Sequence, residues 1–368
     1  MAKTCFGLRV AAAAMAVAVL LNAVEAARLL MKDTPTANEW ASVRGVNYVV
    51  STATNSVQMW IEYDPRLIER ELDLATAPVR FNAVRVFIHA YPWLVGGDAR
   101  KVFLSNVEHF CAAAAARKLK PLVVLFDDDF IEVAKTATEA LAYVRSGAWK
   151  GAGWMTSPGT GLITEDATKS PDAKPSGVSY PLWEAFATDV LAAARRGGPL
   201  LGVDLMNEPH QLPNVTAPFI ARMQYVVEST TGLPTTADSF CDADFCRGIP
   251  KGLERVETGV TYHTYWHYHQ NLDCLKANAS SEVAAHHEQM AEQGKELAAA
   301  SGKTDLMVTE FGMAGCYCYA ARALTKVGVG WILWGLVVGF PGAWQSMYYS
   351  NGTAVISADE IKCLQELE

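Results

Sequence analysis

The sequence has few charged residues and no cluster of basic ones. Charged residues make up 19% of the chain, and the formal net charge is −8 at pH 7. Proteins that follow a nucleic-acid backbone neutralise phosphates with grouped Lys and Arg, so we expect no nucleic-acid partner. A neutral polymer would be unaffected by this charge. Because 51% of the residues are hydrophobic, the chain can bury a large core and differs from disordered sequences.

Two common catalytic motifs are also missing. The sequence contains neither the Gly-x-Ser-x-Gly of serine hydrolases nor the Gly-x-x-x-x-Gly-Lys-Ser/Thr of phosphate-binding loops. His263 and His267 share one face of a predicted strand and form the basis of an alternative, a metal hydrolase. Zinc at Cys316 and Cys318 is disfavoured because no second Cys-x-x-Cys or His pair stands at ligand spacing beside them. We predict no metal and no cofactor.

The first residues have the pattern of a secretory signal. Basic residues precede an apolar run from Val10 to Leu21, and small residues around Ala26 fit a cleavage site. The run is shorter than the ~20 residues of a membrane-spanning helix. We therefore predict a signal peptide over residues 1–26 and one secreted domain over residues 27–368. This domain is expected to be monomeric and free of the membrane after cleavage.

Seven of the eight cysteines remain after that cleavage, so one has no intramolecular partner. Five of the seven follow the fifth, sixth and seventh predicted strands, where disulfides would brace neighbouring loops in an oxidising compartment. We take Cys241 with Cys246 as the first candidate pair. Three sequons match the glycosylation pattern and matter only in a eukaryotic host: Asn214, Asn278 and Asn351.

Short β-branched segments alternate with longer helical ones along the whole chain, which predicts parallel strands joined by helical crossovers. Eight strands are expected: Ser42–Val50, Ala83–His89, Pro121–Asp127, Leu201–Met206, Pro234–Ser239, Val260–Tyr265, Leu306–Glu310 and Gly328–Trp334. The helices expected between and after them are Pro65–Ala77, Lys101–Arg117, Trp183–Arg196, Pro218–Thr231, a short one at Lys251–Val256, Ser281–Ala300 and one from Ala358.

Eight such units in a chain of this length predict an α/β fold with a single domain, a (β/α)8 TIM barrel. A long loop insertion follows the third strand and contains a helical stretch from Ile131 to Arg145. Long loops beside an active face are more often functional than idle.

Two glutamates, each ending an apolar run, carry the functional prediction. Glu208 follows Leu200-Leu-Gly-Val-Asp-Leu-Met-Asn207 and precedes a proline, and Glu310 ends Leu306-Met-Val-Thr. At the carboxyl ends of two barrel strands, both side chains face the same mouth. Glycoside hydrolysis with retention requires two such carboxyl groups about 5 Å apart, one as acid/base and one as nucleophile.

With these motifs the chain, from about Val43 to Trp344, resembles glycoside hydrolase family 5, a cellulase-like family in the clan of retaining (β/α)8 glycosidases. The resemblance implies that Glu208 is the acid/base and Glu310 the nucleophile. It also implies sugar-facing or supporting roles for five further residues: Arg85, Asn207, His263, Tyr265 and Trp334. The family's histidine near the end of the third strand is replaced here by Asp127 in an Asp-Asp-Asp run.

Physical reasons for these roles exist independently of the family. We expect Arg85 to lower the pKa of Glu310 and keep it ionised. We expect Glu208 to titrate higher, because of partial burial and the charge of Glu310. His263 and Tyr265 share a strand face, and Trp334 offers a flat apolar surface to a pyranose ring, unless it fills the barrel.

Two further features remain open. Asp127, or its neighbour Asp128, either binds sugar hydroxyls or starts the loop and caps the following helix. Five tryptophans fall in loops on the predicted active side, where they would line several sugar subsites or pack the loops: Trp93, Trp149, Trp154, Trp266 and Trp344.

The sequence as a whole predicts a secreted retaining β-glycosidase that acts internally on a β-1,4-glucan or β-mannan. Its partner would be a carbohydrate polymer or oligosaccharide. Two alternatives remain: an exo-acting β-glycosidase on short oligosaccharides, and a secreted glycan-binding barrel without catalytic activity.

Overall fold

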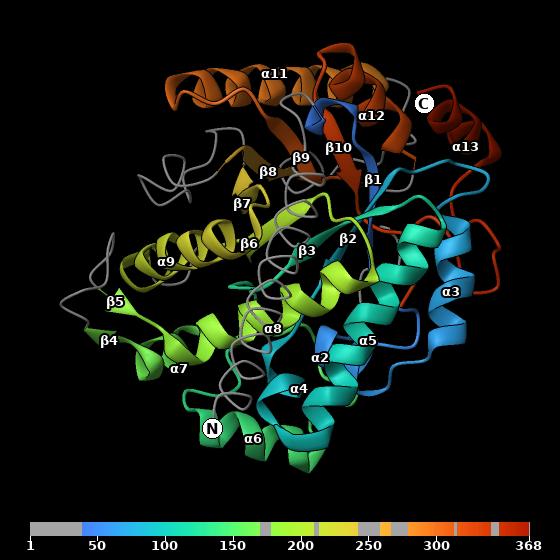
Figure 1. Ribbon diagram of the computed structural model, residues 1–368. Helices are drawn as coiled ribbons and strands as arrows, with labels where there is room; N and C mark the ends of the chain where they lie inside the picture. The colour runs from blue at the N-terminus through green and yellow to red at the C-terminus, as the bar shows by residue number, and fades with distance from the viewer. Residues whose placement is uncertain are drawn as a thin grey trace, which may run out of the picture.

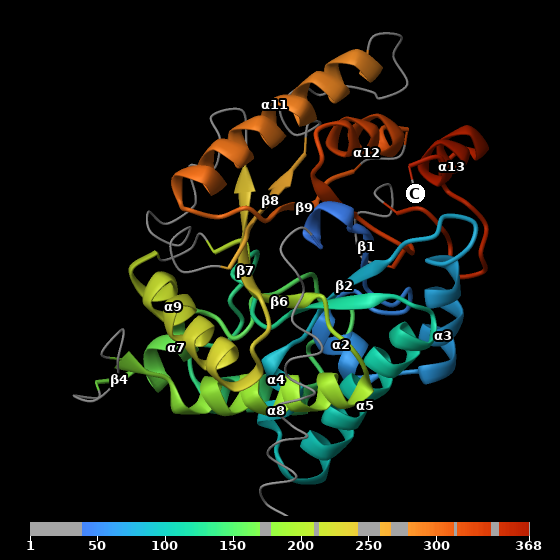
Figure 2. The same ribbon diagram turned by 45° about the horizontal axis from the view of Figure 1, so that its top comes forward.

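The computed structural model describes residues 39–169, 178–209, 213–241, 258–265, 279–312, 315–339 and 346–367. Eight parallel strands form a closed barrel in the order β1-β10-β9-β8-β7-β6-β3-β2, and helices surround it (Figures 1 and 2). A separate two-stranded hairpin, β4 (Thr168–Lys169) and β5 (Val178–Ser179), lies in the insertion after β3. The predicted (β/α)8 barrel is confirmed.

All eight predicted strands are present, with ends that shift by a few residues. They are β1 (Arg44–Tyr48), β2 (Ala83–Phe87), β3 (Lys120–Val124), β6 (Gly202–Asn207), β7 (Thr235–Cys241), β8 (Val260–Thr264), β9 (Leu306–Glu310) and β10 (Gly330–Leu333). The register of β6 with β7 and of β8 with β9 shifts near their carboxyl ends, at Asn207 and His263. Both irregularities lie beside predicted site residues, where bulges commonly re-aim side chains.

The helices begin with η1 (Trp40–Ser42), a short 3-10 helix at the amino end of the described chain. The others are α2 (Ser56–Ile61), α3 (Pro65–Leu74), α4 (Ala90–Leu94), α5 (Gly97–Ala116), α6 (Ala137–Ser146), α7 (Thr160–Asp166), α8 (Pro181–Gly197), α9 (Pro213–Thr231), α11 (Ala279–Ala300), α12 (Tyr317–Lys326) and α13 (Ala358–Gln365). The helix predicted at Lys251–Val256 lies outside the described residues. Within the described part of the chain, no helix combines the length and apolarity needed to cross a bilayer.

The helix predicted from Ile131 begins six residues later, at Ala137. Thr136 has extended backbone and accepts a hydrogen bond from the Glu139 N–H, so it is the N-cap. Ile131 itself pairs with Met155 in an isolated bridge. The segment before Thr136 therefore belongs to the mouth of the barrel rather than to the helix.

Helix α12 was not predicted, although its buried residues include Tyr317, Ala320, Ala321 and Leu324 at helical spacing. A disulfide joins Cys318 in α12 to Cys363 in α13, with Cα atoms 5.8 Å apart. Cys316 is also disulfide-bonded, whereas Cys111 is free and buried. The pairing expected for Cys241 involves a residue, Cys246, that lies outside the described part.

The barrel interior changes character along its axis. At one end, apolar residues form a sealed cluster: Trp40, Val43, Ala83, Leu122, Leu201, Met307 and Ile332. Gly330 is required there, because a Cβ would lie 1.7 Å from the Trp40 carbonyl oxygen. Toward the carboxyl ends of the strands, polar residues at most 1% exposed point inward instead: Asn47, Arg85, Asp204, Asp238, Thr261 and His263. A polar interior at this end marks the functional face.

Candidate active site

The two predicted catalytic glutamates lie together at the carboxyl ends of their strands. Glu208 follows β6 directly, with φ of +44°, and Glu310 is the last residue of β9. A carboxylate oxygen of Glu208 lies within 4.8 Å of one of Glu310, with an imidazole nitrogen of His263 inside the same limit. This upper limit lies below the ~6.5–9.5 Å separation of the two carboxyl groups in inverting glycosidases.

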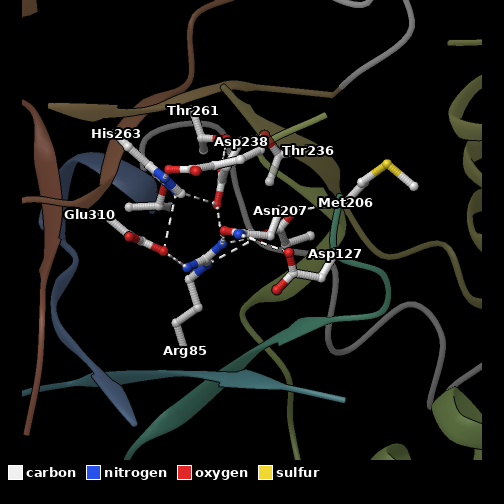
Figure 3. A network of polar contacts seen from close by, with 12 residues as sticks. Arg85, Asp127, Met206, Asn207, Thr236, Asp238, Thr261, His263 and Glu310 are labelled. Atoms are coloured by element: carbon white, nitrogen blue, oxygen red, sulfur yellow. Dashed lines mark hydrogen bonds and ion pairs between the residues drawn. The ribbon is translucent and has the colours of Figure 1, made fainter. Parts of the chain in front are cut away.

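Arg85 lies at the centre of the site, between β6, β7 and β9 (Figure 3). It is 0% exposed. Its Nη1 donates to Glu310 Oε1 at 2.5 Å and to Asn47 Oδ1 at 3.0 Å. Its Nη2 donates to Asn207 Oδ1 at 2.7 Å and to Asp204 Oδ2 at 2.6 Å. One guanidinium therefore fixes side chains from three different strands, β1, β6 and β9.

The carboxyl groups around Arg85 determine its charge. Nη2 also lies 2.9 Å from Asp238 Oδ2 in an ion pair. Burial alone lowers the pKa of Arg85, but the three surrounding carboxyl groups outweigh it and raise the pKa. Burial and Asp238 raise the pKa of Asp204, whereas Arg85 and His263 overcome burial and lower that of Asp238. The guanidinium stays charged because it is enclosed by acids.

Glu310 is held by two donors. Arg85 Nη1 binds Oε1, and the Tyr265 hydroxyl donates to Oε2 at 2.7 Å. Burial raises the pKa of Glu310, and His263 and Arg85 lower it, as expected for Arg85. The net shift is nevertheless upward, so the predicted net lowering of this pKa was wrong. Burial of the side chain, at 9% exposure, outweighs the cations.

Glu208 contacts a histidine and a second acid. His263 Nδ1 lies 2.6 Å from Glu208 Oε1. The Asp129 side chain forms a hydrogen bond with Glu208, and burial together with the charges of Glu208 and Asp127 raises the pKa of Asp129 to about 9. Two adjacent carboxyl groups in a poorly solvated place do not both ionise readily. The Asp129–Glu208 pair therefore retains a proton at neutral pH.

His263 bridges the two glutamates. Its Nε2 lies 3.4 Å from Asp238 Oδ2 and 3.5 Å from Glu310 Oε1, while Nδ1 faces Glu208. Burial lowers the pKa of His263, but the neighbouring carboxylates, Glu310 first, raise it to about 10. At neutral pH both ring nitrogens carry protons and face carboxylates. Figure 3 shows His263 and Glu310 on the same side of Arg85.

Asn207 and Asp127 form the opposite edge of the network. Asn207 Nδ2 donates to Asp127 Oδ1 at 3.3 Å, and Trp154 Nε1 donates to Asp127 Oδ2 at 2.7 Å. Burial raises the pKa of Asp127 to about 7, against the hydrogen bonds it accepts. Asp127 caps no helix, since the N-cap of the next helix is Thr136. It orients Asn207 and the following loop.

Three of the five loop tryptophans are buried, which favours loop packing over sugar binding. Trp93, Trp149 and Trp154 are each at most 4% exposed, and Trp93 belongs to α4. They pack the loops, which is the second of the two alternatives given for them above. Trp334 remains partly exposed, and its ring meets Phe87 and Trp154 edge to face at 5.6 and 6.4 Å. The other two predicted tryptophans, Trp266 and Trp344, lie outside the described residues.

Sequence reasoning missed four members of the network. Asn47, Asp129, Asp204 and Asp238 all contact predicted site residues. Three of them are buried polar residues of barrel strands, and a buried polar side chain requires a partner. Asp204 could have been found in this way, because it is a charged residue within the otherwise apolar segment Gly202–Met206.

The donor set suits proton transfer better than metal binding. Glu208, His263 and Glu310 present atoms close enough for a cation. An imidazolium offers no lone pair to a metal, and Arg85 already supplies a positive charge at Glu310. The predicted alternative ligand His267 lies outside the described residues.

The fold and the site define a (β/α)8 barrel with a close glutamate pair at its mouth. No protein-family model matches the sequence. A comparison with curated proteins gives no match either. Comparison with solved structures shows that the fold is that of glycoside hydrolase family 5.

Three structures illustrate this likeness. The exo-β-1,4-mannosidase Op5Man5 from Opitutaceae bacterium strain TAV5 has a TM-score of 0.59 and 17% identity, over 91% of this chain and 61% of its own. The endo-β-1,4-mannanase from Thermotoga petrophila has a TM-score of 0.55 and 14% identity, over 88% and 76%. A variant of the family 5 mannosidase from Rhizomucor miehei has a TM-score of 0.53 and 12% identity, over 88% and 92%.

Replacing Arg85 tests the central ion network. We expect Arg85→Met to lower the free energy of unfolding by ~3–5 kcal/mol, because buried acids lose their cation. The control is Arg196→Met, which removes a surface pair with Glu108 and should cost at most ~1 kcal/mol. Urea unfolding at neutral pH measures both. Equal effects of the two substitutions would contradict the network.

The pKa of His263 predicts how stability depends on pH. Its folded pKa of about 10 exceeds the unfolded value of ~6.5, so the stabilisation is complete below ~6.5 and is lost as pH rises through about 10. Over that interval we expect the unfolding free energy to fall by up to roughly 1.4 kcal/mol per pH unit. His263→Asn should flatten the decline, and His109→Asn, at a partly exposed histidine, should not. Parallel profiles for wild type and His263→Asn would refute this.

Proposed function

We propose that this protein is a retaining β-glycosidase in which Glu310 is the nucleophile and Glu208 the acid/base. The observation that carries the proposal is the short separation of the two carboxylates, within 4.8 Å, combined with their unequal surroundings. Glu310 accepts hydrogen bonds from Arg85 and Tyr265. Glu208 instead contacts His263 and forms a hydrogen bond with Asp129.

In the first step Glu310 attacks the anomeric carbon while a proton passes from Glu208 to the departing oxygen. Arg85 and Tyr265 orient the attacking carboxylate, which approaches from the side opposite the leaving oxygen, so the covalent glycosyl ester forms with inversion at that carbon. The sugar–oxygen bond breaks as the ester bond forms. Asp129 forms a hydrogen bond with Glu208 and is the neighbouring acid from which Glu208 can regain a proton between turnovers.

In the second step water replaces the departed sugar. Glu208, now a carboxylate, removes a proton from that water, which attacks the same carbon and releases Glu310. His263 lies beside both carboxylates and compensates their combined negative charge when Glu208 is ionised. Two inversions give a product with the configuration of the substrate.

We propose a β-1,4-linked mannan or glucan as the substrate, in an extracellular setting. Mannan is the first to test, because the fold neighbours are named as β-mannanases and mannosidases. The buried tryptophans remove one argument for a long cleft, so exo action on short oligosaccharides stays an alternative to endo action. Secretion rests on the signal pattern of residues 1–26, which lie outside the described residues. The mature chain, residues 27–368, is proposed to be a monomer.

Substitution of the two glutamates tests the mechanism. Glu208→Ala and Glu310→Ala should each reduce polysaccharide hydrolysis at least ~10³-fold, because each removes a group used in both steps. Azide should rescue Glu310→Ala with an activated substrate and yield a glycosyl azide of inverted configuration. The control is Glu184→Ala, whose carboxylate pairs with Arg222 between α8 and α9, with unchanged turnover per folded protein.

A proton NMR time course of the wild-type reaction completes this test. The first product formed should keep the β configuration. An α product would contradict double displacement, and binding of β-glycans without hydrolysis across a broad panel would favour the non-catalytic alternative.

A further inference from the structure

Phe130 is an exposed aromatic residue next to the candidate acid/base. It follows Asp129 in the loop after β3, and 58% of Phe130 is exposed, with 63% of the adjacent Ile131. Phe87 and Trp154, by contrast, are buried, and Trp334 is only partly exposed. Phe130 and Ile131 are thus two consecutive exposed apolar side chains beside the candidate site, where such residues commonly belong to a binding surface.

The backbone fixes Phe130 from both sides. Asp127 and Ile131 each pair with the segment 155–157 across the loop. Phe130 has φ of +66°, and its N–H donates to Asp129 Oδ1 at 2.9 Å. A bulky residue in this conformation costs ~1–3 kcal/mol and persists only where its surroundings impose it, most often at functional sites. The exposed ring is therefore presented by a constrained loop.

The same loop is aligned with Glu208 by strand pairing. The Asp128 N–H donates to the Asn207 carbonyl oxygen at 2.9 Å, which extends the β3–β6 pairing to the mouth. In that register Asp129 stands beside Glu208, and their side chains form a hydrogen bond. Phe130 therefore follows directly on Asp129, the residue that contacts the candidate acid/base Glu208.

We propose that Phe130 forms a leaving-group subsite that binds the pyranose ring attached to the departing oxygen. This inference rests on the proposed function, because the acid that protonates that oxygen is Glu208. The C–H face of a pyranose is apolar and packs on an aromatic ring, while Asp129 offers its carboxyl group to hydroxyls at the same edge. The ring that Glu310 attacks lies on the other side of the broken bond.

Two substrates with the same attacked sugar separate this subsite from the catalytic centre. One is a β-1,4-linked oligosaccharide, whose leaving group is a sugar, and the other is the glycosyl fluoride, whose leaving group is a single atom. Phe130→Ala should lower the oligosaccharide-to-fluoride ratio of kcat/KM about tenfold, or ~1.4 kcal/mol. Phe130→Tyr should restore the ratio. The control is Tyr225→Ala, at a 48% exposed aromatic on α9, which should leave it unchanged.

The outcomes are distinct. An unchanged ratio in Phe130→Ala, or an equal loss with both substrates, overturns the subsite and indicates a role in loop folding or none. If the wild-type protein cleaves neither substrate, the proposed function fails, and calorimetric binding of the oligosaccharide to wild type and Phe130→Ala then decides the subsite. Weaker binding by the variant supports a pyranose site at Phe130, and equal or absent binding rejects it.

Discussion

A fully buried guanidinium requires anionic and polar partners, and at Arg85 this requirement determines how the mouth of the barrel is built. Arg85 binds Asn47, Asp204, Asn207, Asp238 and Glu310, which come from β1, β6, β7 and β9. The desolvation cost of the cation is offset only if all these groups converge. Strand ends that are distant in sequence are therefore held in one arrangement, and Glu310, the proposed nucleophile, is one of the groups so held.

The same constraint makes the two glutamates unequal. Glu310 lies on the Arg85 side, with both carboxylate oxygens bound by donors. Glu208 lies beyond Asn207, against His263 and Asp129, where an acid pair retains a proton. His263 carries the second positive charge and faces both acids. The two carboxyl groups therefore lie close together in different surroundings, as the proposed division into nucleophile and acid/base requires.

Much of the fold was predictable, because parallel strands in a barrel are short apolar segments with regular helical crossovers. Leu306–Glu310 matches β9 at both ends. The approximate positions of Arg85, His263 and Tyr265 followed from strand ends and from the family resemblance. The net pKa shift of Glu310 did not follow, because it depends on burial that only the closed barrel creates. Asp129 was also missed, since its contact with Glu208 depends on β3–β6 register. The burial of Trp93, Trp149 and Trp154 depends on loop packing, which has no sequence period.

The most direct measurement of the assignment of roles is to trap the covalent intermediate. A 2-deoxy-2-fluoro glycosyl fluoride slows the second step more than the first, so the sugar remains on the nucleophile. Digestion and mass spectrometry of the inactivated protein should place the label on Glu310, and Glu310→Gln should remain unlabelled. A label on Glu208 or another carboxylate, or steady turnover of natural substrate with no label at all, would contradict the account.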